Sequence, residues 1–104
     1  MRGDVLKGHL DLLLLAVLAD EPAHGYAVVE RLKHRSRGAF ELAEGTVYPA
    51  LHRLERMGLL TSGWSVAAGR KRRVYRLTAR GRSALDRGRR DWHGFAGAVE
   101  AVLA

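Results

Sequence analysis

The chain has 104 residues, a formal net charge of +7 and no cysteine. This length predicts one domain with a single modest core, small enough that a second copy of the chain could be needed to complete it. The lack of cysteine excludes a disulfide framework, a cysteine-based zinc site and thiol redox sensing.

Residues 5–19 are predicted to form the first helix. Nearly every position in this stretch is apolar, and a helix that is apolar almost all round must be buried on two sides. In so short a chain we expect a partner subunit to cover the second side, which places Val5 and Leu6 at a dimer interface. The apolar run 12–19 is far shorter than the ~20 residues that cross a bilayer, and no signal-peptide cleavage site follows it. A cytoplasmic protein is therefore expected.

A second helix is predicted for about 24–34, after Pro22 has ended the first one. The residues expected to face inward, or their neighbours, are Tyr26, Val29 and Leu32. Gly25 near the start of this helix allows a close backbone approach, either to the first helix or to a phosphate. For His24 we favour a capping or packing role over a catalytic one, because no partner nucleophile lies near it in the sequence.

The stretch 45–60 carries the pattern around which the other elements are arranged. Its helical spacing seats one apolar stripe against the core, made of Val47, Leu51, Leu54 and Met57. The opposite side carries Tyr48, His52, Arg53 and Arg56. Gly58 stands where a helix commonly ends. A short helix with one apolar and one cationic face suits DNA reading, because the major groove admits a single α-helix. The alternative is an ordinary amphipathic surface helix.

Two starting points are possible for this helix. Pro49 favours the later one, with Thr46 as the cap, because proline is comfortable only in the first turn, where its missing N–H would be unpaired anyway. Ala43 marks the earlier one, but its side chain has no oxygen that could accept a backbone N–H.

A strand pattern replaces the helical one from Leu59 to Thr78. The predicted strands, 60–66 and 73–77, flank the segment 67–72. This arrangement is a hairpin with a basic tip, called the wing below. Trp64 is expected to pack the wing onto the helices rather than to stack on a base.

The positive charge is concentrated in one part of the chain. Residues 69–90 hold ten lysines and arginines against one acid, Asp86, so this segment carries +9 and the rest of the chain −2. The helices predicted for 24–34 and 45–60, joined by a loop, form a helix-turn-helix pattern. A basic patch beside such a pattern indicates a polyanion partner, although a charge run can also be a solvated surface. Arginine bonds phosphates and base edges through its planar fork. The residues expected to reach phosphates or the minor groove are Arg70, Lys71, Arg72 and Arg73.

The last helix is predicted from Thr78 to Leu103. Apolar residues recur at intervals of seven in two series, which are Leu85, Trp92 and Val99, and Phe95 and Val102. Such a seam suits pairing with another helix. Each of the glycines Gly88, Gly94 and Gly97 weakens an isolated helix by roughly 1 kcal/mol relative to alanine. This helix is therefore expected to pair with a partner.

Four sequence blocks occur in a specific order. They are Pro22-Ala23-His24-Gly25-Tyr26; Gly45-Thr46-Val47-Tyr48-Pro49-Ala50-Leu51 with Arg53-Leu54-Glu55 and Gly58-Leu59; Trp64 with Gly69-Arg70 and Tyr75-Arg76-Leu77-Thr78; and Gly81 with Trp92. Together the blocks resemble the PadR family of winged-helix transcriptional regulators, over nearly the whole chain. One departure is Ala43, where relatives commonly carry a serine that would cap the recognition helix.

The resemblance implies a mainly α (α+β) fold. Residues 1–78 would form a winged helix-turn-helix DNA-binding domain with a two-stranded β wing, and residues 79–104 a long C-terminal dimerisation helix. PadR-like proteins dimerise through this helix and the first one, and the short subclass, which this length matches, has no further C-terminal domain. The expected dimer interface comprises Val5, Leu6, Leu85, Trp92, Phe95, Val99 and Val102.

In function, the resemblance implies a homodimeric repressor of transcription. Two recognition helices would enter successive major grooves, so the operator would be a pseudo-palindrome with half-sites about one helical turn apart. The residues expected to meet bases and backbone are Thr46, Tyr48, Pro49, His52 and Arg53. Gly25 and Tyr26 would approach a phosphate, and the wing cations would supply salt-dependent affinity.

The resemblance also implies a small-molecule effector. Short members of the family often bind flat aromatic compounds between the paired late tryptophans, where a dimer seam can open a pocket. Trp92 is therefore the candidate sensor, with Arg89, Phe95 and Leu12 as its expected neighbours, and the basic surroundings favour an aromatic acid or phenolate over a cation. The alternative is that Trp92 is plain dimer-core packing.

Two other classes of function have some support in the sequence. An enzyme or metal site would rest on His52 with Glu55, or on His9 with Asp11. Neither pair has a third ligand at metal-site spacing, and no phosphate loop or nucleophile motif occurs, so no enzyme, metal or cofactor is expected. A winged helix that binds RNA or protein, without effector control, is the alternative to a DNA-binding regulator.

Overall fold

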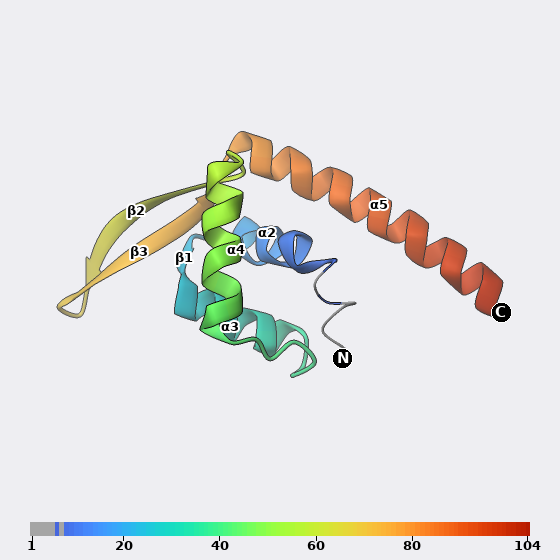
Figure 1. Cartoon of the computed structure of the whole chain (residues 1–104), viewed down its shortest axis with the longest axis horizontal. Helices are drawn as coiled ribbons and strands as arrows, with labels where there is room; N and C mark the ends of the chain where they lie inside the picture. Colours follow the sequence, from blue (N-terminus) through green and yellow to red (C-terminus); the bar gives the residue numbers. More distant parts are fainter. Residues whose placement is uncertain (1–5, 7) are drawn as a thin grey trace.

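The computed structural model describes Leu6 and residues 8–104, so Val5, expected at a dimer interface, lies outside the described residues. The elements in chain order are α2 (Leu10–Asp20), β1 (Ala23–His24), α3 (Gly25–Arg35), α4 (Glu44–Arg56), β2 (Leu60–Ala67), β3 (Arg70–Leu77) and α5 (Ala79–Leu103). In Figure 1 the β2–β3 hairpin and α5 extend in opposite directions from a body made of α2, α3 and α4. The predicted mainly α (α+β) winged helix-turn-helix fold is confirmed.

Within the described residues, the helix predicted for 5–19 corresponds to α2. It begins at Leu10, because Gly8 and His9 form a turn in which the His9 N–H donates to the Leu6 carbonyl at 2.9 Å. The helix ends before Pro22, with Glu21 in an extended conformation, as expected. It packs against α3, α4, α5 and β3. Much of its apolar surface is therefore covered within one chain.

The sheet has a strand that the sequence analysis missed. Within the described residues the strand order is β1-β3-β2, all antiparallel, so the predicted two-stranded wing gains β1 at one edge. Ala23 pairs with Tyr75 and His24 pairs with Val74. A strand of only two residues has no alternation of its own to detect.

The hairpin turn is tighter than the predicted loop 67–72. The strands run directly into Ala68 and Gly69, whose φ angles of 54° and 75° are those of a two-residue turn with positive φ at both positions. The chain therefore reverses within two residues. As a result the residues expected at a basic tip, Arg70, Lys71 and Arg72, lie in β3.

The recognition helix α4 takes the earlier of its two possible starts. It begins at Glu44, with Ala43 as a cap that makes no side-chain hydrogen bond, so the later start at Thr46, which Pro49 favoured, is not the one that the helix takes. Pro49 lies inside the helix, where the N–H that it lacks would have donated to Gly45. Gly45 is exposed, so water can reach the carbonyl that is left without this donor. The last helical residue is Arg56, and Gly58, whose φ is 79°, follows the cap residue Met57, which is the position predicted for it.

The core lies between α2, α3, α4 and the inner part of the sheet. Its completely buried members include Leu14, Val28, Val47, Leu51, Leu54, Leu60 and Tyr75. One predicted inward position was wrong. Met57 is half exposed, because it lies just past Arg56, the last residue of α4, whereas the rest of the predicted stripe is buried together with Ala50. On α3 the buried residues are Gly25, Val28 and Leu32, which agrees with the prediction that Tyr26, Val29 and Leu32 or their neighbours face inward.

The start of α5 is fixed against the end of α4. The Thr78 hydroxyl accepts from the Gly81 N–H at 3.0 Å and donates to the Gly58 carbonyl at 2.7 Å, so the predicted start at Thr78 is confirmed with a cap. Gly81 lies so close to the Leu59 carbonyl that a side-chain methyl group would overlap it. Leu85 is 2% exposed in the core of its own chain. It has almost no surface left for a dimer interface, which corrects that expectation.

Candidate nucleic-acid interface

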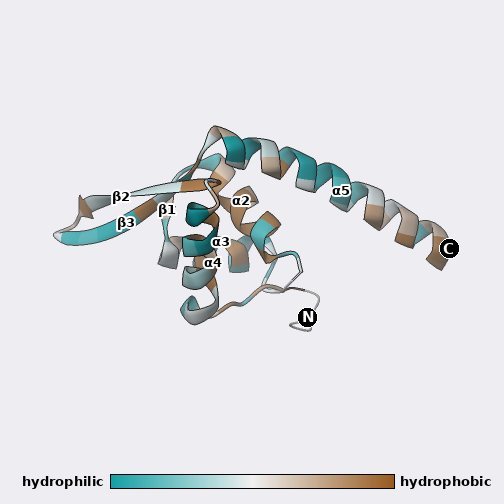
Figure 2. Ribbon diagram, turned by 45° about the horizontal axis from the view of Figure 1, so that its top comes forward, coloured by the Kyte–Doolittle hydropathy of each residue, from teal (hydrophilic) through white to brown (hydrophobic). Residues whose placement is uncertain are grey.

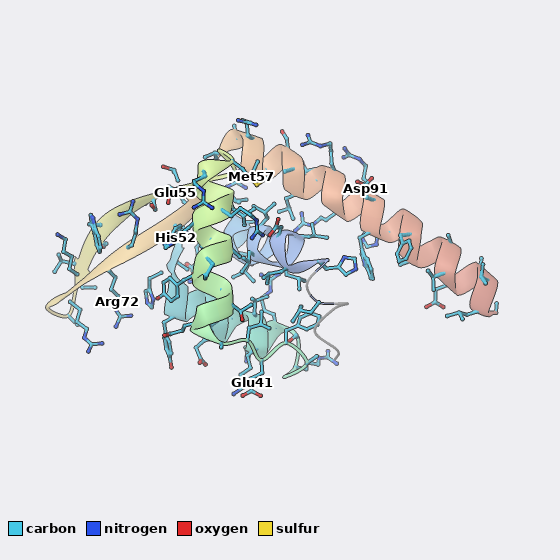
Figure 3. All side chains as sticks on the ribbon, viewed as in Figure 1. Glu41, His52, Glu55, Met57, Arg72 and Asp91 are labelled. Carbon is cyan, nitrogen blue, oxygen red and sulfur yellow. The ribbon has the colours of Figure 1, made fainter. Side chains whose placement is uncertain are left out.

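The side of α4 opposite its buried stripe is exposed. Thr46, Pro49, His52, Arg53 and Arg56 all lie on this exposed side, and Tyr48 is half-buried at its edge. In Figure 3, His52 and Glu55 lie on the side of α4 that faces the hairpin, from which Arg72 extends. The structure therefore brings the expected recognition-helix residues together on one surface beside the wing.

Arg53 is held by a residue that the sequence analysis did not connect with it. Its guanidinium donates to the Asp11 carboxylate on α2, and both side chains are about half exposed. Asp11 is distant in sequence, and no local pattern links the two. Exposed pairs of this kind contribute at most about 1 kcal/mol, so a phosphate can compete with Asp11 for this cation.

Gly25 and Tyr48 form the junction between α3 and α4. A side-chain methyl group at Gly25 would overlap the Tyr48 ring, so the close backbone approach predicted at this glycine exists. Its partner is the recognition helix rather than α2. Tyr26 is half exposed, and its ring lies parallel to that of His24 with centroids 6.5 Å apart.

His24 caps α3, as the preferred interpretation of this residue predicted. Its Nδ1 accepts from the Ala27 N–H at 3.3 Å, and Arg72 Nη1 of the wing lies 2.7 Å from its Nε2. A neutral imidazole can accept at only one of its nitrogens at a time, so Ala27 and Arg72 compete for it. Burial, followed by the positive charges of Arg72 and Arg31, lowers the pKa of His24 from its ordinary value.

Acidification is expected to destabilise the fold through His24. Its folded-state pKa lies below the ordinary 6.5, so the contribution of His24 to stability is present above that value and is lost as the pH falls through the lowered pKa. Urea unfolding followed from about pH 7.5 to about pH 5 should show this loss. His24→Asn keeps a capping acceptor that does not titrate in this range, and it should flatten the profile. A variant with the same pH profile as the parent would rule His24 out as the cause.

The wing carries cations without acidic partners. In the described part of the chain no carboxylate pairs with Arg70, Lys71 or Arg72, whereas Arg73 Nη2 lies 3.9 Å from Glu55 Oε2 of α4. A groove of about 570 Å³ separates the wing from the helices. It is lined by His24, Tyr26, Glu44, Tyr48, His52, Trp64, Arg70, Lys71, Arg72, Arg73 and Tyr75. Its lining combines aromatic rings with unpaired positive charge, a combination suited to nucleic acid.

Trp64 does not pack the wing onto the helices, and this prediction was wrong. The side chain is 60% exposed. The hairpin extends beyond the body, so Trp64 is already outside the core, while Tyr75 further along the same face is buried. Lys71 Nζ and Arg73 Cζ lie 4.9 and 5.3 Å from the centroid of its ring.

The comparison with protein families agrees with this geometry. The family described as "Transcriptional regulator PadR-like family" matches residues 14–87. The chain belongs to this family. PadR-like proteins are transcriptional regulators that bind DNA, and they are not enzymes. The resemblance inferred from the four sequence blocks is thereby confirmed.

Individual relatives of this PadR-like chain agree with the assignment. Transcriptional regulator Rv3488 of Mycobacterium tuberculosis (strain ATCC 25618 / H37Rv) is 47% identical over 79 residues, covering 76% of this chain and 71% of the relative. A PadR family transcriptional regulator from Eggerthella lenta DSM 2243 has a TM-score of 0.84 and 34% identity, covering 96% of this chain and 86% of its own. A transcriptional regulator from Clostridium thermocellum, at 22% identity and a TM-score of 0.90 over 100% of this chain and 99% of its own, shares the fold.

The surroundings of Trp92 in this PadR-like chain include a residue that the sequence analysis did not place there. The His9 ring, at the start of α2, meets the Trp92 ring edge to face, with centroids 5.2 Å apart. The ring centroid of Phe95 lies 6.3 Å from that of Trp92. Leu12 packs against Gly88 of α5, where a side-chain methyl group would come within 2.6 Å of Leu12 Cδ1. The glycine expected to weaken α5 thus permits its close contact with α2.

The described residues contain neither a cluster of metal-binding side chains nor a helix that could span a membrane. Among the described residues, no three histidine, cysteine or acidic side chains gather where they could hold a metal ion. None of the helices in the same residues is both long enough and apolar enough to span a bilayer.

Proposed function

We propose that this PadR-like regulator is a homodimeric repressor that binds a pseudo-palindromic operator and is released by a small aromatic effector. Residues 1–78 would bind DNA and residues 79–104 would dimerise. The α4 helices of the two protomers would enter successive major grooves about one helical turn apart. The proposed contacts to DNA come from Gly25, Tyr26, Thr46, Tyr48, Pro49, His52, Arg53, Arg70, Lys71, Arg72 and Arg73.

The observation that carries the proposal of a dimer is the apolar stripe on the second half of α5. Trp92, Phe95, Val99 and Val102 are 43%, 60%, 37% and 84% exposed in the single chain. They recur at heptad spacing along a helix whose end extends beyond the body (Figure 2). A contiguous exposed apolar surface of this kind marks an interaction site. A second copy of α5 offers the same stripe, and an isologous contact would cover both. Leu6, half-buried near α2, would lie at the edge of this contact.

The effector is proposed to bind at Trp92. The ring is partly exposed, and His9 and Phe95 already contact it, so a flat aromatic molecule could add to this cluster. Arg89 lies one helical turn away from Trp92, on an exposed part of α5, and Leu12 lies at the neighbouring α2–α5 contact. This basic surrounding favours an aromatic acid or phenolate.

The effector proposal can be tested by fluorescence. The chain has two tryptophans, so a Trp64→Phe background leaves Trp92 as the single reporter. Titration with a hydroxybenzoate should quench the emission of this variant and weaken operator binding by the parent chain at the same concentrations. Tighter binding of a planar cation than of the aromatic acid would contradict this proposal.

The repressor proposal is tested by binding to a duplex from the promoter region of the chain's own gene and to a scrambled duplex, across a salt series. Specific binding by a dimer, lost steeply as salt rises, is expected. Equal and weak affinity for both duplexes would instead favour the alternative, a winged helix that binds RNA or protein.

Removing two wing cations is expected to weaken binding to every duplex. Arg70→Ala combined with Arg72→Ala should lower affinity for operator and scrambled DNA alike. It should also flatten the salt dependence by about 0.9 log units per log unit of salt for each phosphate that the variant no longer neutralises. Both side chains lack an acidic partner among the described residues, so little ion-pair energy is removed from the free protein.

The matched control for the wing variant removes the same charge from α5. Arg82→Ala with Arg90→Ala changes two exposed side chains on the helix that extends away from the wing. This control should leave the salt slope close to that of the parent. Equal affinity of parent and wing variant at several salt concentrations would show that Arg70 and Arg72 do not contact phosphates.

A further inference from the structure

The outer half of the wing carries an exposed apolar surface that the fold does not use. Trp64 is 60% exposed and Val66 is 71% exposed. They are two residues apart on β2, so their side chains point to the same face of the hairpin. Neither is among the buried core residues or the partly buried residues that pack against them. Their apolar surface therefore contributes little to holding this chain together.

The same face carries cations on the neighbouring strand. Trp64 pairs with Arg73, and Val66 pairs with Lys71, and residues that pair directly across strands share a face. Lys71 Nζ is 4.9 Å from the Trp64 ring centroid. The result is a short apolar ridge, Trp64 with Val66, that is flanked by positive charge.

This ridge has a fixed relation to the recognition helix. Arg73 Nε donates to Ser62 Oγ at 2.8 Å, and Ser62 Oγ donates to Glu55 Oε2 of α4 at 2.5 Å. Arg73 in turn lies over the Trp64 ring. A chain of contacts thus runs from the end of α4 to the indole. When α4 occupies a major groove, the position of Trp64 beside that groove is set by the protein.

We propose that Trp64 and Val66, flanked by Lys71 and Arg73, form an apolar contact to the minor groove of A·T base pairs next to the sequence that α4 reads. This inference rests on the proposed binding of an operator duplex through α4. It makes Trp64 a specificity-determining residue, with a contribution to affinity that does not depend on salt.

The chemistry of the ridge selects the minor groove over the phosphates. Indole and isopropyl groups offer phosphates almost no donors, whereas proteins that bind the minor groove place apolar wedges there together with arginine and lysine. A·T tracts narrow this groove and strengthen its negative potential, which attracts the flanking cations. A G·C pair adds the guanine 2-amino group to the groove floor, where it would obstruct an apolar side chain.

The test compares the parent chain with Trp64→Ala on three operator duplexes whose flanks are A·T, G·C or inosine·C. Inosine lacks the 2-amino group of guanine, so its pair with cytosine resembles A·T in the minor groove. The parent should prefer A·T and inosine·C flanks to G·C flanks. Trp64→Ala should lose about tenfold in affinity on A·T flanks, in the range of aromatic contacts to bases. It should lose the flank preference and keep the salt slope of the parent.

The control is Ser65→Ala, on the same strand but on the opposite face, where Ser65 pairs with Arg72. This variant should keep the flank preference. A Trp64→Ala variant that keeps the parent's affinity and flank preference would overturn the inference, as would one that lowers the salt slope, since Trp64 would then act only by positioning cations. If the parent itself fails to distinguish operator from scrambled DNA, the proposed function fails instead, and the two failures are thus distinguishable.

Discussion

Phe95→Asp combined with Val99→Asp is expected to give a folded monomer that binds the operator at least about a hundredfold more weakly. Both side chains are already exposed in the single chain, at 60% and 37%, so its own core should survive the change. In the proposed dimer the same positions would be covered, and an unpaired buried carboxylate costs several kcal/mol. Each half-site would then be bound without the help of the other.

Two measurements on the same samples check this prediction. Sedimentation gives the mass of the parent and the variant, and a titration with operator duplex gives their affinities. His93→Asp with Ala101→Asp is the matched control, because it places two aspartates on the exposed polar side of α5. This control should remain dimeric. A variant that is still a dimer, or a monomer with unchanged operator affinity, would contradict the role proposed for the α5 stripe.

Gly81→Ala is expected to lower the free energy of unfolding by about 2–3 kcal/mol, as overpacking of a rigid site does. The added methyl group would overlap the Leu59 carbonyl oxygen, which belongs to the backbone and cannot turn away. The Leu59 carbonyl also accepts from the Thr78 N–H at 3.2 Å. Moving it would therefore strain the junction from which α5 starts.

Urea unfolding of Gly81→Ala and Gly97→Ala makes the comparison within one helix. Among the described atoms, nothing lies within 4 Å of the position that a methyl group would take at Gly97. That substitution should raise the free energy of unfolding by up to about 1 kcal/mol, the helix propensity of alanine over glycine. Equal unfolding midpoints for the two variants would mean that the start of α5 accommodates the added methyl group without loss of stability.

The elements that could be predicted from the sequence are those with a local pattern. The stripe of Val47, Leu51 and Leu54 predicted the recognition helix and its buried face, and Gly58 predicted its end. The seven-residue recurrence on α5 predicted the apolar face that leaves the body at Trp92. In each case the determining contacts join residues within one or two turns of the same helix, so the order of the residues is sufficient.

The tertiary structure alone decided which residues from distant segments meet. The Asp11 contact to Arg53, the His9 ring beside Trp92 and the second strand neighbour of β3 each join parts of the chain without a shared pattern. Trp64 is a second example of what the sequence does not determine. Its sequence neighbours predict a strand, but whether a strand position lies over the core depends on how far the hairpin extends past the helices. Periodicity determines which face of an element a residue occupies, while only the packing of the elements determines what that face meets.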